Sequence, residues 1–393
     1  LRICEPSASS VTLRRELSEL SAISTLPIPQ KTVQVPQRLR TASYWALALV
    51  FAAVYLGSLF SPPLLDDADS SHAEAAREMY ASGDYVTLHI NGVRYLEKAP
   101  LPYWLVAGSY HLFGVNEFAT RLPMALSVML LGILAIVWGT RAFGERAGIY
   151  AGLFVYTAAG VFLFTRILIP DVLLSLLIAA SLYFWLCALE DRGPAWKWYA
   201  GYICIALGVL TKGLIALVFP AGTAFFYLLI TGDWRRWREF RMVSGFLLFL
   251  VIAAPWHILA GLRNTGGQGG HGFFWFYFVN EHFLRFLGKR YPRDYNKLPW
   301  ALYWSLHLVW LFPWSFYLPA AIRTAVRTRK SSANFQDRTR LLCYVLAGLV
   351  LVFFAVSTNQ EYYTLPAYFP LLMLLADSIS HDEGKECDTG QRE

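Results

Sequence analysis

The sequence is poor in charge and in cysteine. Only 16% of its 393 residues are Asp, Glu, Lys or Arg, whereas a soluble globular domain carries about a quarter. The five cysteines have no metal-ligand spacing, so they predict neither a disulfide framework nor a zinc site. Hydrophobic residues make up 56% of the chain, and the mean hydropathy is +0.41. These values exclude a soluble enzyme and a disordered chain, and they indicate an integral membrane protein.

Apolar residues gather in about ten windows of roughly 16 to 22 residues, the length at which a helix crosses a hydrocarbon core about 30 Å thick. The windows are approximately Thr41–Phe60, Leu122–Thr140, Ala147–Phe164, Asp171–Leu189, Trp198–Leu210, Leu214–Ile230, Met242–Leu259, Leu298–Ile322, Leu341–Val356 and Leu365–Ala376. They are apolar on every side, as helices in a membrane are. The predicted fold is therefore an all-α polytopic membrane protein.

Three regions are predicted along the chain. Residues 1–40 are polar and rich in Ser, Pro and Gln, which favours a disordered cytoplasmic extension. Residues 41–377 hold all the apolar windows and are the expected transmembrane domain. Residues 378–393 are expected to be a polar tail.

The positions of Lys and Arg predict the orientation. If the N-terminus is cytoplasmic and the windows alternate, most of the 34 basic residues fall in cytoplasmic loops, as the positive-inside rule requires. The net charge of +7 therefore needs no nucleic acid partner to explain it. Two long segments, 61–121 and 261–297, then lie on the outer face, and long ordered loops are where function usually sits. Apolar spacing predicts interfacial helices over 70–81 and 101–113 in the first of them.

The first outer segment begins with the string LLDDADSSHAEAAREM, which brings Asp66, Asp67 and Asp69 to the start of a predicted helix. One interpretation is that Asp69 or Ser70 caps this helix and the other carboxylates are solvated. The other is a general base, because partial desolvation at the membrane surface raises the pKa of a carboxylate toward neutrality.

The string RYLEKAPLPYW in the same segment places Glu97 and Lys98 side by side before an apolar helix. An exposed pair of this kind usually contributes little. Here it also suits an anionic head group, with Lys98 on a phosphate and Glu97 on a metal or a sugar hydroxyl.

Further polar residues lie at the predicted outer ends of the apolar windows or, for His282 and Arg285, in the second outer segment. They are Arg166, Asp171, Lys212, His282, Arg285, Tyr362 and Tyr363. Snorkelling and an interfacial tyrosine belt would explain several of them individually. Because all of them fall on one face of the membrane, they predict a shared site for a phosphate-bearing substrate and an acid-base step.

The motifs resemble those of polytopic glycosyltransferases that use polyprenyl-phosphate sugars, a GT-C-type family. The similarity is to bacterial lipid A aminoarabinose transferases and, more distantly, to dolichyl-phosphate-mannose protein mannosyltransferases. It is carried in family order by DADSSHAEAAREMYASGDYVTLHINGVRYLEKAPLPYW, FGVNEFATRLP, LIPDVLL, LTKGLIALVFP, FVNEHFLRF and YYTLPAYFPL. The first loop departs from the usual Asp-Glu pair, because it reads Asp-Ala-Asp-Ser, so the identity of the base stays ambiguous.

The resemblance implies an inverting transferase with Asp67 or Asp69 as catalytic base and Asp171 as a second carboxylate. The residues expected to bind the donor phosphate are Lys98, Arg166, Lys212, Arg285 and Tyr363, and those expected to hold a divalent metal ion are Glu97 and His282. The polyprenyl tail is expected in a groove of apolar and aromatic side chains. The C-terminal soluble domain of many relatives is expected to be missing.

The predicted reaction moves a sugar from a polyprenyl-phosphate donor to a hydroxyl or phosphate of lipid A, a glycan, a lipid or a protein. The protein is expected to be a monomer in the bacterial inner membrane, with its active site on the periplasmic side. A secondary transporter or flippase for a lipid-linked or anionic solute is the alternative. Transporters place polar residues near the midplane and show internal repeats, neither of which this sequence indicates. The sequence leaves the sugar and the acceptor open.

Overall fold

The computed structural model describes residues 37–64, 67–191, 193–266, 270–293, 298–327, 334–357 and 360–390. Most of the predicted N-terminal extension, 1–40, therefore lies outside the described residues. Tyr44–Glu393 forms one compact unit, and all contacts below lie within it.

The described residues are almost entirely helical, as predicted. Four helices are long and apolar enough to cross a membrane: α5 (Glu117–Phe143), α8 (Asp171–Asp191), α11 (Met242–Arg263) and α14 (Phe335–Val356). Two bent pairs raise this number to six among the described residues: α6 (Glu145–Thr157) with α7 (Ala159–Arg166), and α12 (Trp300–Trp310) with Trp314–Arg323. Shorter apolar helices cover Thr41–Leu56 and Ile215–Thr231. The chain is thus an all-α integral membrane protein, and the number of ten spans stays a prediction.

The other elements include further helices of the bundle and the short segments between them. They are α2 (Gln37–Phe51), η1 (Ala52–Leu56), α3 (Asp67–Ser82), β1 (His89–Ile90), β2 (Val93–Arg94), α4 (Leu101–Phe113), α9 (Trp196–Lys212), α10 (Ile215–Thr231), η2 (Trp234–Phe240), η4 (Trp275–Leu284), η5 (Trp314–Tyr317), α13 (Leu318–Arg327), η6 (Glu361–Thr364) and α15 (Leu365–Gly390). Every predicted apolar window coincides with one of the helices or with a bent pair.

The bend of 104° after α12 has a local cause. Pro313 follows the end of the helix, has no amide hydrogen to donate, and disfavours helical backbone in the residue before it. The predicted window over residues 298–322 is therefore two helices rather than one straight span.

The core of the bundle is built on close helix contacts. A Cβ atom on Gly139 of α5 would lie 2.9 Å from the Cα of Gly148 in α6, so these helices touch where neither has a side chain. The central helix α8 has buried residues around its whole circumference, including Val172, Leu174 and Leu186. This helix begins at Asp171, so the core holds that carboxylate firmly at its end.

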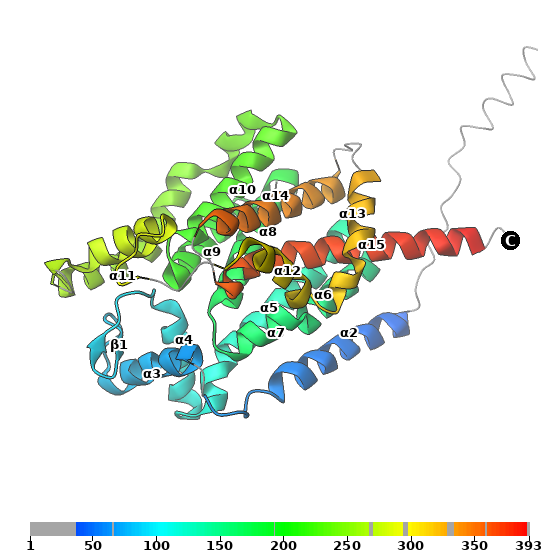
Figure 1. Ribbon diagram of the computed structural model, residues 1–393. Helices are drawn as coiled ribbons and strands as arrows, with labels where there is room; N and C mark the ends of the chain where they lie inside the picture. The colour runs from blue at the N-terminus through cyan, green and yellow to red at the C-terminus, as the bar shows by residue number, and fades with distance from the viewer. Residues whose placement is uncertain are drawn as a thin grey trace, which may run out of the picture. The chain divides into compact units, whose positions relative to one another are not determined.

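A small cap with its own hydrophobic core precedes α5. Its core residues lie in and between α3 and α4 and include Ala76, Met79, Tyr103 and Tyr110. The two-stranded antiparallel ribbon of β1 and β2 lies beside these helices (Figure 1). The predicted interfacial stretches 70–81 and 101–113 are thus confirmed as helices. The segment between β2 and α4 carries the Glu97-Lys98 pair.

Candidate active site

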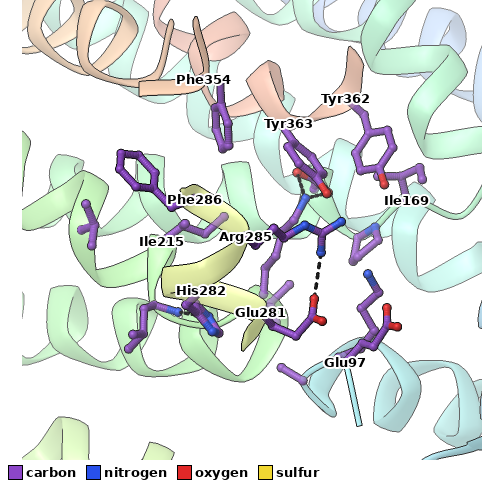
Figure 2. Close-up of a pocket in the computed structure, with 18 of the residues that line it drawn as sticks. Glu97, Ile169, Ile215, Glu281, His282, Arg285, Phe286, Phe354, Tyr362 and Tyr363 are labelled. Atoms are coloured by element: carbon purple, nitrogen blue, oxygen red, sulfur yellow. Dashed lines mark hydrogen bonds and ion pairs between the residues drawn. The ribbon is translucent and has the colours of Figure 1, made fainter. Parts of the chain in front are cut away.

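A cavity of about 340 Å³ lies between the cap, the ends of α8 and α9, and the segments η4 and η6. Polar side chains line one part and apolar side chains the other (Figure 2). The polar lining comprises His72, Glu97, Lys98, Tyr103, Asp171, Thr211, Lys212, Glu281, His282, Arg285, Ser357, Tyr362 and Tyr363. Residues almost 300 positions apart in the sequence therefore share one space, as the motif analysis predicted.

Asp171 and Lys212 form the ion pair at the base of the polar wall. The first residue of α8 meets the last residue of α9, and the Lys212 ammonium lies 2.5 Å from both Asp171 carboxylate oxygens. The same ammonium lies 4.3 Å from the ring centre of Tyr363 and 5.0 Å from that of Tyr362. Because the Asp171 side chain is only 1% exposed, its charge depends on Lys212 for compensation.

Lys98 reaches the cavity from the cap. Pro100 caps the N-terminus of α4 and Pro102 lies in its first turn, a position where proline is tolerated, so the two prolines stiffen the chain after Lys98. Burial, and next the positive charge of Arg285, lower the pKa of the Lys98 ammonium. Glu97 beside it pairs with Arg290, at 2.7 Å between carboxylate and guanidinium.

The segment η4 contributes a second group of charges. The Arg285 guanidinium lies 3.0 Å from a Glu281 carboxylate oxygen and 5.7 Å from the ring centre of Tyr363. Figure 2 shows Arg285 between these two residues. Burial is the main reason why the pKa of Glu281 is raised, and the nearby charge of Glu97 adds to it.

Both ring nitrogens of His282 are used inside the protein. Nδ1 lies 2.6 Å from the Tyr277 carbonyl oxygen, which can only accept, so Nδ1 carries the proton. Nε2 then accepts a hydrogen bond of 3.1 Å from the Leu214 amide. Burial lowers the pKa of this imidazole and keeps it neutral. The close approach requires Gly213, where φ is +83° and a Cβ atom would lie 2.2 Å from Nε2.

His72 of α3 is a lining residue that the sequence analysis did not single out. Its Nδ1 lies 2.7 Å from the hydroxyl of Tyr103. Burial, and then the charges of Lys98 and Lys212, lower the pKa of His72 to about 3, so the ring is neutral near pH 7. It faces the cavity as a hydrogen-bonding group without charge.

The apolar wall extends from the charged residues toward the bundle. Its side chains come from α10, η4 and α14, and they are Ile215, Val218, Phe283, Phe286, Phe353 and Phe354. Figure 2 shows Ile215, Phe286 and Phe354 on the side of the cavity away from Glu97. The cavity therefore combines a charged end and a hydrocarbon-like end, which suits a lipid with a charged head.

Two predicted site residues, Asp69 and Arg166, are described and are not among those that line the cavity. Asp69 is buried against Arg121, at 3.6 Å between carboxylate and guanidinium. Arg166 donates hydrogen bonds to the backbone carbonyls of Ser58 and Ser61 and so holds the chain that leads into the cap. The side chain of Asp67 lies outside the described residues. The identity of the first-loop base therefore stays a prediction.

Glu281 and Arg290 are charged residues that the motif reading passed over. Glu281 stands inside the string NEHFLRF, where only its neighbours were assigned a role. The spacing of residues 281 and 285 on one helical face was the available signal. Arg290 lies in a loop rich in charge, and no pattern distinguishes it from a solvated arginine.

The two predicted metal ligands have other partners. Glu97 faces Arg290, and His282 uses both nitrogens within the protein, as described above. No three His, Cys, Asp or Glu side chains gather closely enough to hold a metal ion in the part of the chain that the structure describes. As arranged, these residues do not fit a divalent cation.

Sequence comparisons find similarity to glycosyltransferases, the class of protein that the motifs resemble. A family model described as dolichyl-phosphate-mannose-protein mannosyltransferase matches residues 97–259. An undecaprenyl phosphate-alpha-4-amino-4-deoxy-L-arabinose arabinosyl transferase from Aeromonas salmonicida is 35% identical over 359 residues, which cover 87% of this chain and 61% of that protein. The corresponding transferase from Aeromonas hydrophila is 32% identical, with 88% and 62% covered. The chain thus spans less than two thirds of the length of these relatives.

Solved structures give a consistent result. ArnT from Cupriavidus metallidurans, crystallised with undecaprenyl phosphate bound, matches with a TM-score of 0.77 and 27% identity over 86% of this chain and 60% of that one. An oligosaccharyltransferase from Archaeoglobus fulgidus matches with a TM-score of 0.58 and 13% identity over 88% and 51%, which shows a shared fold. The chain is therefore related, in sequence and in fold, to the polytopic GT-C glycosyltransferases that use polyprenyl-phosphate sugars, as its motifs predicted.

Proposed function

We propose that this chain transfers a sugar from a polyprenyl-phosphate donor to an acceptor hydroxyl or phosphate, with inversion at the sugar carbon. The observation that carries the proposal is the two-part cavity, with Lys98, Lys212 and Arg285 in its polar wall and an aromatic and aliphatic wall beside them. The relation to arabinosyl transferases and to a structure with bound undecaprenyl phosphate supports this choice over a transporter.

The apolar wall receives the first isoprene units of the donor. The phenylalanines of this wall offer an environment in which a hydrocarbon chain gains about 25 cal/mol for each Å² removed from water. The phosphate then lies at the junction with the polar wall. This placement requires no charge to enter the apolar part of the cavity.

Cations in the polar wall stabilise the leaving group. When the bond between the sugar carbon and the phosphate oxygen breaks, the polyprenyl phosphate gains negative charge. Lys98 and Arg285 face that position as preorganised donors, and Lys212 is held there by Asp171 and the two tyrosines. Such preorganised charges lower the barrier because they need no reorientation during the reaction.

The acceptor proton needs a base. We retain Asp67 and Asp69 as the proposed candidates, because both stand at the start of α3, one turn before the lining residue His72. The base takes the proton of the acceptor hydroxyl as the acceptor oxygen attacks the sugar carbon from the face opposite the phosphate. The acceptor is a lipid A, glycan, lipid or protein group, and the cavity is proposed to open on the periplasmic face of the inner membrane.

Binding of undecaprenyl phosphate to the purified chain in detergent, followed by native mass spectrometry, tests the proposal. Lys212→Gln removes a cation from the cavity and leaves Asp171 uncompensated, so affinity should fall at least about tenfold. Lys197→Gln is the matched control, because Lys197 also pairs with an aspartate on α8, Asp191, but does not line the cavity. Equal affinities of the wild type and both variants would refute the proposed donor site.

A further inference from the structure

Arg290 joins two carboxylates that line the cavity. Its Nη2 lies 2.7 Å from a Glu97 oxygen, and its Nε lies 2.6 Å from a Glu281 oxygen. One guanidinium therefore links the cap to η4, two outer segments that are far apart in the sequence. The side chains of Arg290 and Glu281 are only 8% and 3% exposed, so water screens the contact between these two weakly, whereas Glu97 is 28% exposed.

The backbone is built to bring Arg290 to this place. Gly288 follows η4 with a φ of +69°, and the Lys289 amide donates to the Leu284 carbonyl, so the chain turns back on η4. The buried amide of Asn280 then holds the next residue, Tyr291, by two hydrogen bonds to its backbone, at 2.7 and 2.9 Å. These contacts fix the position of Arg290 independently of its ion pairs.

The charges around the cavity show why this arginine matters. Among the lining residues that the structure describes, three are cations, Lys98, Lys212 and Arg285, and three are carboxylates, Glu97, Asp171 and Glu281. Both lining histidines are neutral, because burial lowers the pKa of His72 and His282. The lining charges therefore cancel, and a donor phosphate would meet no net attraction without a further cation beside the carboxylates.

We infer that Arg290 is a positioning residue that supplies the positive charge and the cross-link which a divalent cation at Glu97 would otherwise supply. Its guanidinium pairs with Glu97 and Glu281, brings the net charge of the described lining residues together with Arg290 to +1, and holds the cap against η4. Donor binding in this chain then depends on Arg290 and is independent of divalent metal. This inference rests on the proposed function for its ligand, while the cross-link itself stands without it.

The first test measures the cross-link without any ligand. Hydrogen exchange is followed by mass spectrometry in wild type, Arg290→Gln and Arg293→Gln. Arg293→Gln is the matched control, because it removes the same charge from an exposed position of the same loop. Compared with wild type, hydrogen exchange in segments 93–98 and 284–291 should be at least about tenfold faster in R290Q and less than about twofold faster in R293Q. The reason is that only R290Q loses a buried, charge-assisted contact. Equal exchange in both variants would overturn the inference, whatever the donor is.

The second test measures undecaprenyl phosphate affinity with and without EDTA. Wild type should change less than about twofold on chelation, and R290Q should bind at least about tenfold more weakly, because one charge near the phosphate is lost. Added Mg²⁺ should restore part of the R290Q affinity by binding between Glu97 and Glu281, which have both lost Arg290 as a partner. If EDTA lowers the undecaprenyl phosphate affinity of the wild type tenfold, the inference is overturned. If the wild type does not bind undecaprenyl phosphate at all, the proposed function is refuted, and the hydrogen exchange result alone decides whether Arg290 is a cross-link.

Arg290→Lys is a second variant that tests the inference even if R290Q fails to fold. Lysine keeps the charge but is a point charge that cannot bridge two carboxylates in the fork geometry of arginine. R290K should therefore bind undecaprenyl phosphate within about threefold of wild type while its segments 93–98 and 284–291 exchange faster. If R290K matches wild type in both measurements, Arg290 is not a cross-link and contributes charge alone.

Discussion

Gly213→Ala gives a sharp test of the site geometry. At Gly213 φ is +83°, and an added Cβ atom would lie 2.2 Å from Nε2 of His282 and 3.0 Å from the Tyr277 hydroxyl. Gly232 is the matched control, because its φ is +73° and no atom lies within 4 Å of an added Cβ. At Gly232, where ψ is 3°, the backbone penalty for an L-residue in the left-handed region is roughly 1 to 2 kcal/mol. At Gly213, where ψ is −153°, the backbone lies in a region that essentially only glycine adopts, so its penalty is at least as large.

The clash adds a cost at Gly213 alone. Overpacking costs roughly 1 to 3 kcal/mol, and the lost hydrogen bond from the Leu214 amide to His282 adds about 1 kcal/mol. G213A should therefore lower the free energy of unfolding by at least about 2 to 4 kcal/mol more than G232A. Reversible denaturation in mixed micelles measures this difference, and undecaprenyl phosphate affinity should fall in G213A only. Equal destabilisation by the two variants would show that His282 does not occupy the described position.

Three further predictions concern the charges and the orientation. Because burial lowers the pKa of Lys98, raising the pH from 7.5 should deprotonate Lys98 earlier than a surface lysine and weaken undecaprenyl phosphate binding. Lys98→Arg should make the affinity less dependent on pH. If the affinity of K98R depends on pH as that of the wild type does, another group titrates. Asp67→Asn and Asp69→Asn are made separately. One of the two variants should transfer sugar from a polyprenyl-phosphate donor roughly 10²-fold or more slowly than the wild type, and full turnover in both would place the base elsewhere. In a cysteine-free background, an impermeant thiol reagent added from outside should label Thr265→Cys and not Arg238→Cys, and the reverse pattern would put the cavity on the cytoplasmic side.

Many of the helices could be predicted from the sequence, because buried helices show characteristic lengths and spacings of apolar residues. The apolar windows coincide with helices, and the spacing of Ala73, Ala76 and Met79 predicted α3. The apolar windows do not show whether each of them forms one unbroken helix. Whether a window is one straight helix or a bent pair depends on single residues such as Pro313.

The site was predictable in its members more than in its pairings. Lys212 and Asp171 stood out as charges at the ends of apolar helices, yet their contact depends on how α8 and α9 pack. Arg166 gave the same signal and instead binds backbone carbonyls, because a long cation at a span end has several partners within reach. Arg290 gave no signal, since its burial results from a turn that only the folded loop creates.

The separate core of the cap has a consequence for biogenesis. Its apolar contacts join residues that lie within about fifty positions of one another, so they can form soon after this stretch has been synthesised. The cavity also needs η4 and η6, which are translated much later. A nascent polypeptide that stops after α10 would therefore present a folded cap over an unfinished pocket. The proposed lipid donor could bind only when the last third of the chain has been inserted.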